Sequence, residues 1–274
     1  MADRKDPPLA TGATAEVLPW KDGQVLKLFR ERSPYHQHEL AATRAASATG
    51  LPVPAVIDGL IEFENREGIV FERVDGPTMT RHLEDHSDMA IECAGQMADL
   101  HLEIHQREVS DIVDLEEVLT WAIDRADGLT PGIRNTVLGV LKRLPSGTAL
   151  CHGDFHPHNI IMATRGPVAV DWAVGARGNP VADSARTWLI SRLWLSDLER
   201  GPAKQYWSTF WQAYLSRYRE LRPCPEGELI NWKIVTTAAS LGLVGPLSWI
   251  PAAKQLRIDF VQAILEGDVH RWKN

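Results

Sequence analysis

The chain has 274 residues, of which 44% are hydrophobic and 24% charged, and this balance predicts an ordinary globular protein of one large or two modest domains. A formal net charge of −7 argues against a nucleic-acid partner, because proteins that bind phosphate backbones need clustered Lys and Arg. Three distant cysteines, Cys93, Cys151 and Cys224, indicate neither a disulfide framework nor a CxxC metal site. With an N-terminus that has no apolar segment, they favour a cytoplasmic protein.

The first part of the chain, to residue 74, is predicted to form a small sheet with one helix. Asp22-Gly23 lies between two apolar runs and is typical of a hairpin turn. A helix is expected from Ser33-Pro34 to Thr49, before Gly50. Strands are expected at 15–20, 24–29, 55–63 and 68–74. The Asp75-Gly76-Pro77 segment is predicted to be a linker.

The second part, from residue 75, is predicted to be mostly helical. Apolar residues recur at helical spacing in 88–106 and 131–144, and the chain from Ala182 onward is helical again. Between them lie short β-type runs at 148–151, 159–163 and 168–170. The predicted fold is therefore α+β with two lobes, a sheet-rich lobe at 1–74 and a larger helical lobe at 75–274. A cleft between two such lobes is a natural ligand site.

One segment has the length of a membrane span. Residues 234–253 carry no charge over about twenty positions, which is enough to cross a bilayer. Gly, Pro, Ser and Thr interrupt the segment at eight positions, however. It is therefore predicted to be a buried helix followed by a Pro-rich loop, and no membrane association is expected.

The segments most informative about chemistry are ALCHGDFHPHNIIM, residues 149–162, and VAVDW, residues 168–172. Transfer of a phosphoryl group from ATP needs a carboxylate to orient the attacking hydroxyl, oxygen ligands for Mg²⁺, and cations on the other phosphates. Asp154 offers the carboxylate. Asn159 and Asp171, on adjacent short strands, offer one amide and one carboxylate oxygen for the metal.

At these residues the chain resembles the aminoglycoside phosphotransferase and choline kinase family, whose fold is similar to that of protein kinases. The resemblance rests on the HGDxxxxN motif, His152 to Asn159, and on the aspartate that follows it, Asp171. It implies that Asp154 is the catalytic base and that Asn159 and Asp171 bind Mg²⁺. Trp172 takes the place of the phenylalanine in the DFG motif of protein kinases. Residues 178–186 resemble the family's Gly-x-Pro-x-x-Asp segment, in which the aspartate, here Asp183, is mainly structural.

The resemblance extends to the first lobe and supplies the nucleotide-binding residues. Lys27 in VLKLF is expected to contact the α- and β-phosphates of ATP while Glu39 pairs with it. Glu72 and Val74 occupy the position of the hinge that binds adenine through backbone groups. Gly12 lies in the expected phosphate-covering loop, which departs from the family by having a single glycine. His158 is a second departure, because glycine is frequent there.

The histidines permit a rival interpretation. His152, His156 and His158 have spacing that could hold zinc in a metal-dependent hydrolase. The family resemblance instead implies a buried His152 that hydrogen-bonds loop backbone, and leaves His156 either supporting the loop or touching the transition state. His101 and His105, four residues apart, are predicted to be a core and a surface histidine.

An aromatic stripe in the last third allows two interpretations. Trp207, Trp211, Tyr214 and Tyr218 recur at helical spacing, which is typical of core packing. Alternatively, they could form an aromatic wall for a cationic acceptor.

The predicted function is transfer of the γ-phosphoryl group of ATP to a hydroxyl of a small molecule. The family's acceptors include aminoglycosides, macrolides, amino alcohols and sugar derivatives, so a role in antibiotic resistance is one expectation. A protein acceptor is disfavoured, because only eleven residues separate Asp171 from Asp183 and leave no room for an activation loop. A monomer or homodimer is expected. A catalytically idle kinase-like binding module is the third alternative.

Overall fold

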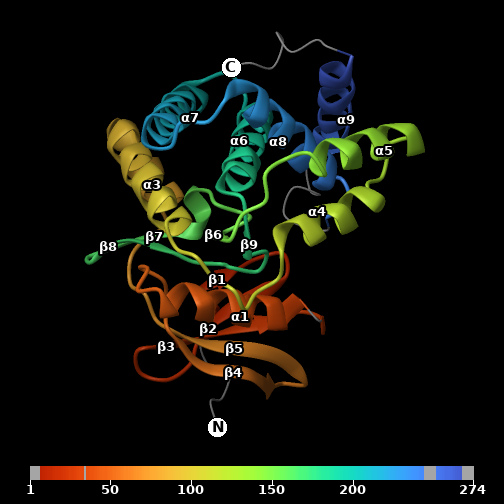
Figure 1. Cartoon of the computed structure of the whole chain (residues 1–274). Coiled ribbons are helices and arrows are strands. Elements are labelled where there is room, and N and C mark those ends of the chain that lie inside the picture. Colours follow the sequence, from red (N-terminus) through yellow and green to blue (C-terminus); the bar gives the residue numbers. More distant parts are fainter. Residues whose placement is uncertain (1–6, 34, 244–250, 267–274) are drawn as a thin grey trace.

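A computed structural model describes residues 7–33, 35–243 and 251–266, with side chains described from residue 254 in the last range. A small β-rich lobe and a larger, mostly helical lobe follow each other along the chain (Figure 1). This is the predicted α+β, two-lobe architecture. The proposed division at 74/75 falls in the segment between the last strand of the sheet and the first helix after it.

The N-terminal lobe is a five-stranded antiparallel sheet with strand order β1-β2-β3-β5-β4. Its strands are β1 (Ala10–Thr11), β2 (Ala15–Pro19), β3 (Gln24–Phe29), β4 (Val56–Phe63) and β5 (Arg66–Glu72). The predicted turn at Asp22-Gly23 joins β2 to β3, and Gly23 has the left-handed φ of 68° that favours glycine.

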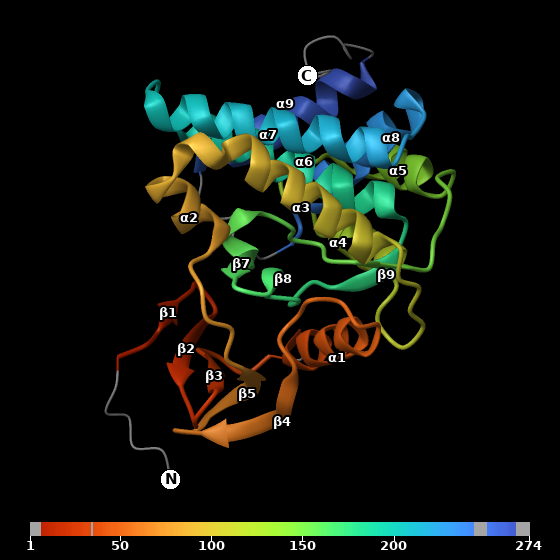
Figure 2. The ribbon, with the colours of Figure 1, turned by 90° about the vertical axis from the view of Figure 1, so that its left-hand side faces the viewer.

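Alternation along β3 decides which way Lys27 faces. Leu26 and Leu28 belong to an apolar cluster on one side of the sheet, whereas Phe29 belongs to the cluster that includes Leu40 of helix α1 (Tyr35–Ala48). Because side chains alternate along a strand, Lys27 lies on the side covered by α1. Figure 2 shows α1 between the sheet and the helical lobe.

Helix α1 also joins the two lobes. Its Ala42 and Ala46 belong to an apolar cluster that contains residues of the helical lobe. At its start, the Ser33 Oγ accepts a hydrogen bond from the Tyr35 backbone N–H, as a helix cap does; Pro34 lies outside the described residues.

The segment between the lobes is fixed to the helical lobe by its backbone. The Met162 N–H donates to the Pro77 carbonyl at 2.8 Å. Gly76 has a φ of 149°, and a Cβ at this position would lie 2.3 Å from the Met162 carbonyl oxygen. Only glycine therefore allows this close approach.

The C-terminal lobe consists of helices around two small two-stranded sheets. Helices α3 and α7 pack against each other, and α8 packs against α6 (Figure 1). Strand β6 pairs with β9 and β7 with β8. The helices are α2 (Met79–Asp85), η1 (Ser87–Met89), α3 (Ala90–His105), α4 (Leu115–Asp124), α5 (Pro131–Leu141), η2 (Pro157–Asn159), α6 (Pro180–Asp197), α7 (Pro202–Leu221), α8 (Glu226–Ala239) and α9 (Pro251–Leu265), and the strands are β6 (Ala149–Cys151), β7 (Ile160–Ala163), β8 (Gly166–Ala169) and β9 (Ala176–Gly178).

The C-terminal aromatic residues are part of the core. Trp207, Trp211, Tyr214 and Tyr218 on α7 are each at most 5% exposed and pack with α3. The core interpretation is therefore confirmed, and these rings do not form an exposed wall. Among the described helices, none combines the length and apolarity that crossing a membrane requires. Residues 244–250 of the uncharged segment lie outside the described residues.

Candidate active site

Lys27, Glu39 and Asp171 form an ion-paired cluster from three elements distant in sequence. The Lys27 Nζ lies 2.6 Å from Glu39 Oε1 and 2.9 Å from Asp171 Oδ1. Burial alone would lower the pKa of Lys27, but the charges of Asp171 and Glu39 outweigh it and raise the pKa, so the ammonium stays protonated. The Lys27 charge in turn lowers the pKa of Asp171. The structure thus brings together three of the predicted site residues.

Asp171 follows β8 in an unusual backbone conformation. Its φ of 65° lies in the left-handed region, which costs a non-glycine residue free energy and is concentrated at functional sites. The preceding Val170 N–H donates to the Asn159 carbonyl, and the Val170 carbonyl is 3.1 Å from His152 Nε2. Residues of the loop between β6 and β7 therefore hold the backbone that presents Asp171.

Asp154, His156 and Asn159 form a second cluster in the loop between β6 and β7. Asn159 Nδ2 donates to the Asp154 carbonyl at 2.9 Å, and His156 Nε2 lies 3.3 Å from Asp154 Oδ2. Burial would raise the pKa of Asp154, but the charges and hydrogen bond of its neighbours, His156 first, lower it to about 2. Asp154 is therefore a carboxylate at neutral pH. Its charge also acts on Asp171, so the two clusters are close.

Gly153 permits the sharp turn before Asp154. Its φ is 79°, and a Cβ there would lie 2.5 Å from the Val174 carbonyl oxygen. Any larger residue would displace the backbone that carries Asp154.

Arg186, on α6, is a site residue that the sequence did not reveal as such. Its Nη2 lies 3.9 Å from Asp154 Oδ1, and the side chain is 12% exposed. In the described part of the chain, Arg186 Nε, Arg186 Nη1 and Asp154 Oδ1 have no hydrogen-bond partner. Buried donors and acceptors are rarely left unpaired, so these atoms mark a place where a ligand could supply partners.

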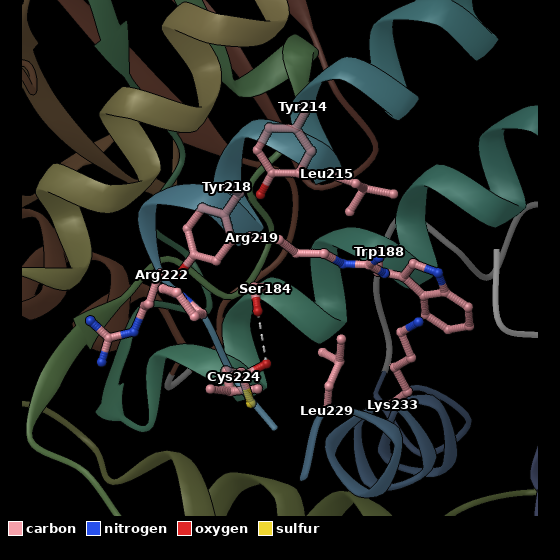
Figure 3. Close-up of a pocket in the computed structure, with 12 residues that line it drawn as sticks. Ser184, Trp188, Tyr214, Leu215, Tyr218, Arg219, Arg222, Cys224, Leu229 and Lys233 are labelled. Carbon is pink, nitrogen blue, oxygen red and sulfur yellow. Dashed lines mark hydrogen bonds between the residues drawn. The ribbon is translucent and has the colours of Figure 1, made fainter. Parts of the chain in front are cut away.

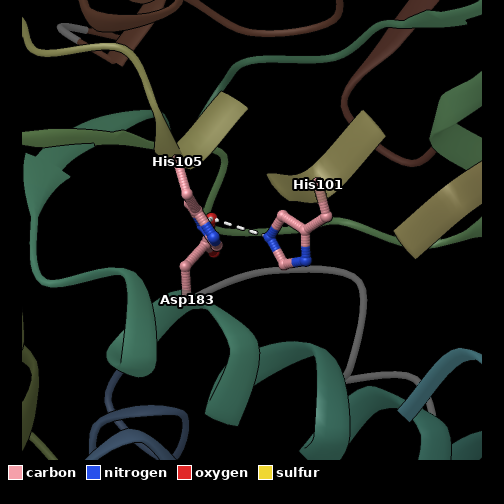
Figure 4. Close-up of side chains that lie close together, drawn as sticks. All are labelled: His101, His105 and Asp183. Atoms are coloured by element: carbon pink, nitrogen blue, oxygen red, sulfur yellow. Dashed lines mark hydrogen bonds and ion pairs between the residues drawn. The ribbon is translucent and has the colours of Figure 1, made fainter. Parts of the chain in front are cut away.

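Asp183, at the start of α6, holds the backbone of the loop between β6 and β7. Its carboxylate accepts the N–H groups of His152 at 2.6 Å and Gly153 at 2.8 Å. It also lies 3.3 Å from His101 Nε2 and 3.1 Å from His105 Nε2 (Figure 4). The structural role implied for Asp183 has this geometric basis.

Two tyrosines complete the network behind Asp183. His101 Nδ1 lies 2.6 Å from the Tyr214 hydroxyl, and His105 Nδ1 lies 2.5 Å from the Tyr218 hydroxyl. Burial lowers the pKa of His101 to about 4 and also lowers that of His105, so both rings are neutral at pH 7. Because the Asp183 carboxylate can only accept hydrogen bonds, each histidine ring donates to it from Nε2. Each neutral ring then accepts a hydrogen bond at Nδ1 from its tyrosine hydroxyl.

The prediction of a surface position for His105 is wrong, since the residue is only 4% exposed. Its spacing from His101 was visible in the sequence, but the third partner, Asp183, lies 78 residues later. In the described part of the chain, these three residues form the one group whose ligand atoms converge as a metal site would require. The hydrogen bonds to Tyr214 and Tyr218 already satisfy both rings without a metal.

The rival zinc cluster does not assemble among the described residues. The His152 Nε2 donates a hydrogen bond to the Val170 carbonyl. Its Nδ1 accepts a hydrogen bond from the Asp154 backbone N–H. The exposed His158 ring stacks instead on Trp194, with a centroid separation of 4.8 Å. The implied role of His152, a buried residue that bonds loop backbone, is confirmed.

The remaining predicted residues lie away from these side-chain clusters. Gly12 is in the turn between β1 and β2, where its carbonyl accepts from Arg30. Glu72 ends β5, and its carboxylate contacts Arg165 at 2.7 Å and the Ala55 N–H at 3.1 Å. Val74 follows at the start of the connection between the lobes. No described contact links these residues to Lys27.

Comparisons with known proteins concern the family and the fold. The model of the "Phosphotransferase enzyme family" matches residues 8–224. A crystal structure of a thermostable aminoglycoside phosphotransferase APH(4)-Ia variant, in complex with AMP-PNP and hygromycin B, is similar with a TM-score of 0.66 at 14% identity, covering 97% of this chain and 95% of that one.

Two further solved structures share the fold. A choline/ethanolamine kinase family protein from Mesorhizobium loti has a TM-score of 0.64 at 16% identity, over 97% of this chain and 90% of that one. The amicoumacin kinase hAmiN, in complex with AMP-PNP, Ca²⁺ and Ami, has a TM-score of 0.59 at 16% identity. The match covers 95% of this chain and 88% of that one. The search of curated protein sequences finds no match.

The chain has the protein-kinase-like fold of phosphotransferases. The family match covers most of the chain, which belongs to the phosphotransferase enzyme family. The resemblance and the enzyme class predicted from the sequence, a small-molecule kinase, are therefore confirmed.

Proposed function

We propose that the chain transfers the γ-phosphoryl group of ATP to a hydroxyl of a small molecule, with Asp154 as the catalytic base. The observation that carries the proposal is the convergence of Lys27, Glu39 and Asp171 beside the loop that holds Asp154 and Asn159. Phosphoryl transfer depends mainly on positioning and charge, which these residues supply together.

The nucleotide would lie between the sheet and the catalytic loop. Lys27, protonated and held by Glu39, would bind the α- and β-phosphates. In the described part of the chain the Val74 N–H has no hydrogen-bond partner, which supports its proposed role as an adenine-binding donor alongside the backbone of Glu72. Gly12 lies in the turn assigned to the phosphate-covering loop, where a small residue lets the backbone approach phosphates closely.

Asn159 and Asp171 fit Mg²⁺ by their donor atoms. Asn159 turns its Nδ2 toward the Asp154 carbonyl, which leaves its amide oxygen for a metal. Asp171 pairs with the Lys27 ammonium through Oδ1. Its side chain is 46% exposed, which leaves the second carboxylate oxygen accessible. Hard oxygen ligands of this kind suit Mg²⁺, which when bound would neutralise phosphate charge.

Asp154 and Arg186 would act on the acceptor. The Asp154 carboxylate, ionised because its pKa is about 2, would orient the acceptor hydroxyl and accept its proton. The unpartnered Nε and Nη1 of Arg186 would bind an oxygen of the acceptor or of the transferring phosphoryl group.

The acceptor class rests on the family. Candidates are hydroxylated antibiotics, amino alcohols and sugar derivatives, and the neighbouring structures were solved with hygromycin B and Ami. A role in antibiotic resistance and Mg²⁺ as the working metal belong to the same proposal.

A screen of hydroxylated antibiotics and metabolites for ADP release, with ATP and Mg²⁺, tests the proposal. We expect at least one compound to stimulate ADP release and to gain a phosphoryl group by mass spectrometry, and Asp154→Ala to abolish both. An acceptor phosphorylated equally well by Asp154→Ala would contradict the assignment of the base. Nucleotide binding without transfer to any acceptor would favour the idle binding module.

A further inference from the structure

A cavity of about 200 Å³ lies between helices α6, α7 and α8 (Figure 3). Trp188 of α6 lines it, whereas Arg186, two residues earlier, lies beside Asp154. Two residues correspond to roughly 200° around a helix, so the cavity and the catalytic loop lie on nearly opposite sides of α6. The cavity is smaller than the roughly 300–1,000 Å³ of sites for drug-sized ligands, which favours a small occupant.

The charges around the cavity are unbalanced. Lys233, Arg219 and Arg222 line it, and no Asp or Glu is among its lining residues. Lys233 is only 4% exposed, and its Nζ lies 4.1 Å from the centroid of the Trp188 ring. In the described part of the chain Lys233 forms no hydrogen bond or ion pair. A buried ammonium with no hydrogen-bond or ion-pair partner costs free energy that an anionic ligand would recover.

A second buried donor is also without a partner. Trp188 is 2% exposed, and its indole Nε1–H has no hydrogen-bond acceptor among the described residues. Figure 3 shows the side chains of Lys233 and Arg219 both extending toward Trp188. After burial, the charge of Arg219 is the next cause that lowers the pKa of Lys233. Three N–H donor groups therefore gather at one end of the cavity.

Much of the remaining wall is apolar, although Ser184 also lines it and donates its hydroxyl to the Val181 carbonyl. Leu215 and Leu229 line it together with the Trp188 ring and Val181. Such a wall suits a flat hydrocarbon body and disfavours a polyol or a second charged group.

We propose that this cavity is a binding site, separate from the nucleotide site, for a small carboxylate with an aromatic or otherwise apolar body. The carboxylate would accept hydrogen bonds from Lys233 and the Trp188 indole and pair with Arg219. The body would pack against Leu215, Leu229 and Val181. An occupant would also touch Tyr214 and Tyr218, which line the cavity and whose hydroxyls bond the histidines that hold Asp183.

Isothermal titration calorimetry with three probes of matched shape tests the proposal. Phenylacetate carries the carboxylate, phenylacetamide is its neutral counterpart, and phenethylamine is its cationic counterpart. We expect phenylacetate to bind the full-length protein at least tenfold more tightly than phenylacetamide, and phenethylamine not to bind. Saturating AMP-PNP with Mg²⁺ should leave phenylacetate binding in place.

Variants locate the site. Lys233→Met keeps the apolar stem on Trp188 and removes the charge, and Trp188→Phe keeps an aromatic ring and removes the N–H. Both variants should weaken phenylacetate binding at least tenfold. Arg219→Gln, at the exposed rim, should weaken phenylacetate binding without affecting folding. Lys142→Met, at an exposed lysine on α5's C-terminal end, is the control and should bind like wild type.

Protonation gives an independent readout. Burial, followed by the charges of Arg219 and Arg192, lowers the pKa of Lys233 to about 7, whereas Glu226 opposes this shift. Burial also raises the pKa values of the tyrosine and cysteine side chains that line the cavity, Tyr214, Tyr218 and Cys224, so they stay neutral between pH 6 and 8. Because phenylacetate would bind the protonated ammonium, its affinity should fall about tenfold from pH 6 to pH 8. Lys233→Met should abolish this dependence.

The proposal is overturned if no probe binds, if all three bind alike, or if Lys233→Met, Trp188→Phe and Arg219→Gln all keep wild-type affinity. Loss of phenylacetate binding in the presence of AMP-PNP would also overturn it, because the ligand would then occupy the nucleotide site.

Discussion

Lys27 Nζ lies 2.9 Å from Asp171 Oδ1 although 144 residues separate them in the chain. Lys27 comes from the sheet of the first lobe and Asp171 from the loop after β8 in the second lobe. The ion pair therefore joins the two lobes at the place where a nucleotide would bind. Glu39 holds the same ammonium from α1. An ATP molecule would find its phosphate-binding cation and a candidate metal ligand already in place, which lowers the cost of organising the site.

Lys27→Met should weaken catalysis by removing the cation on the phosphates. We expect kcat/KM to fall by ~10²–10³, the usual effect of losing one preorganised donor to developing charge. Methionine keeps most of the apolar stem on the α1 side of the sheet, and the melting temperature is the control for folding. Wild-type kcat/KM in a folded Lys27→Met protein would show that the phosphates bind elsewhere.

Asp154→Asn should separate chemistry from binding. The amide keeps the shape of the carboxylate but cannot accept the hydroxyl proton, so we expect kcat to fall by ~10²–10⁴. Because a base acts mainly in the transition state, the dissociation constant for AMP-PNP should stay within about threefold of wild type. Single-turnover kinetics and a nucleotide titration measure the two effects. Equal losses in kcat and in the affinity for AMP-PNP would assign Asp154 a binding role instead.

Asp183→Asn should reveal a positioning role. The carboxylate accepts N–H groups from His152, Gly153, His101 and His105, whereas an amide would turn its own N–H₂ toward some of these donors. We expect a loss of at least ~2 kcal/mol in unfolding free energy. We also expect a lower kcat with little change in KM for ATP, because the misplaced group is the loop that carries Asp154. A purely structural role would lower stability and leave kcat of the folded fraction unchanged.

The buried histidines predict acid-sensitive stability. The pKa of His101 is lowered from 6.5 to about 4 by burial, so between these values the unfolded chain binds more protons than the folded chain. The unfolding free energy should therefore fall, by roughly 1–3 kcal/mol for this residue, as pH drops from 6.5 to 4. Denaturant titrations at several pH values measure this slope.

A pair of variants assigns the acid sensitivity to its source. His101→Gln removes one titrating group and should reduce the slope, while His105 and His152, whose pKa values burial also lowers, keep part of it. His38→Gln, at an exposed histidine, should leave the slope unchanged. Identical slopes in wild type and His101→Gln would show that His101 does not titrate abnormally.

The first lobe could be predicted from sequence because its signals are local. Alternation along 24–29 places Lys27 on a strand with apolar neighbours, and Asp22-Gly23 marks the turn. Short elements were missed: α2 and α4 have seven and ten residues, and β1 and β9 have two and three. Elements of this length show little periodicity, and tertiary contacts rather than propensity decide them.

The candidate site could be predicted only in part, because motif spacing is a local signal whereas burial depends on how the helices pack. Motif spacing predicted Asp154, Asn159 and Asp171 because phosphoryl-transfer chemistry restricts these residue types, and their roles stay predictions. The sequence could not show that His105 is buried, since spacing on α3 does not reveal what the facing helices carry. Arg186 was missed because its role depends on the turn of α6 that faces Asp154, and the cavity at Lys233 depends on how α6, α7 and α8 pack.

The most direct test of the central claim is calorimetric titration of AMP-PNP with and without Mg²⁺, in wild type and in Asp171→Ala. We predict tight, Mg²⁺-dependent binding to wild type and a loss of at least tenfold in Asp171→Ala, with the remaining binding insensitive to Mg²⁺. Binding that is equally tight without Mg²⁺ and in the variant, or no nucleotide binding by wild type, would contradict the account.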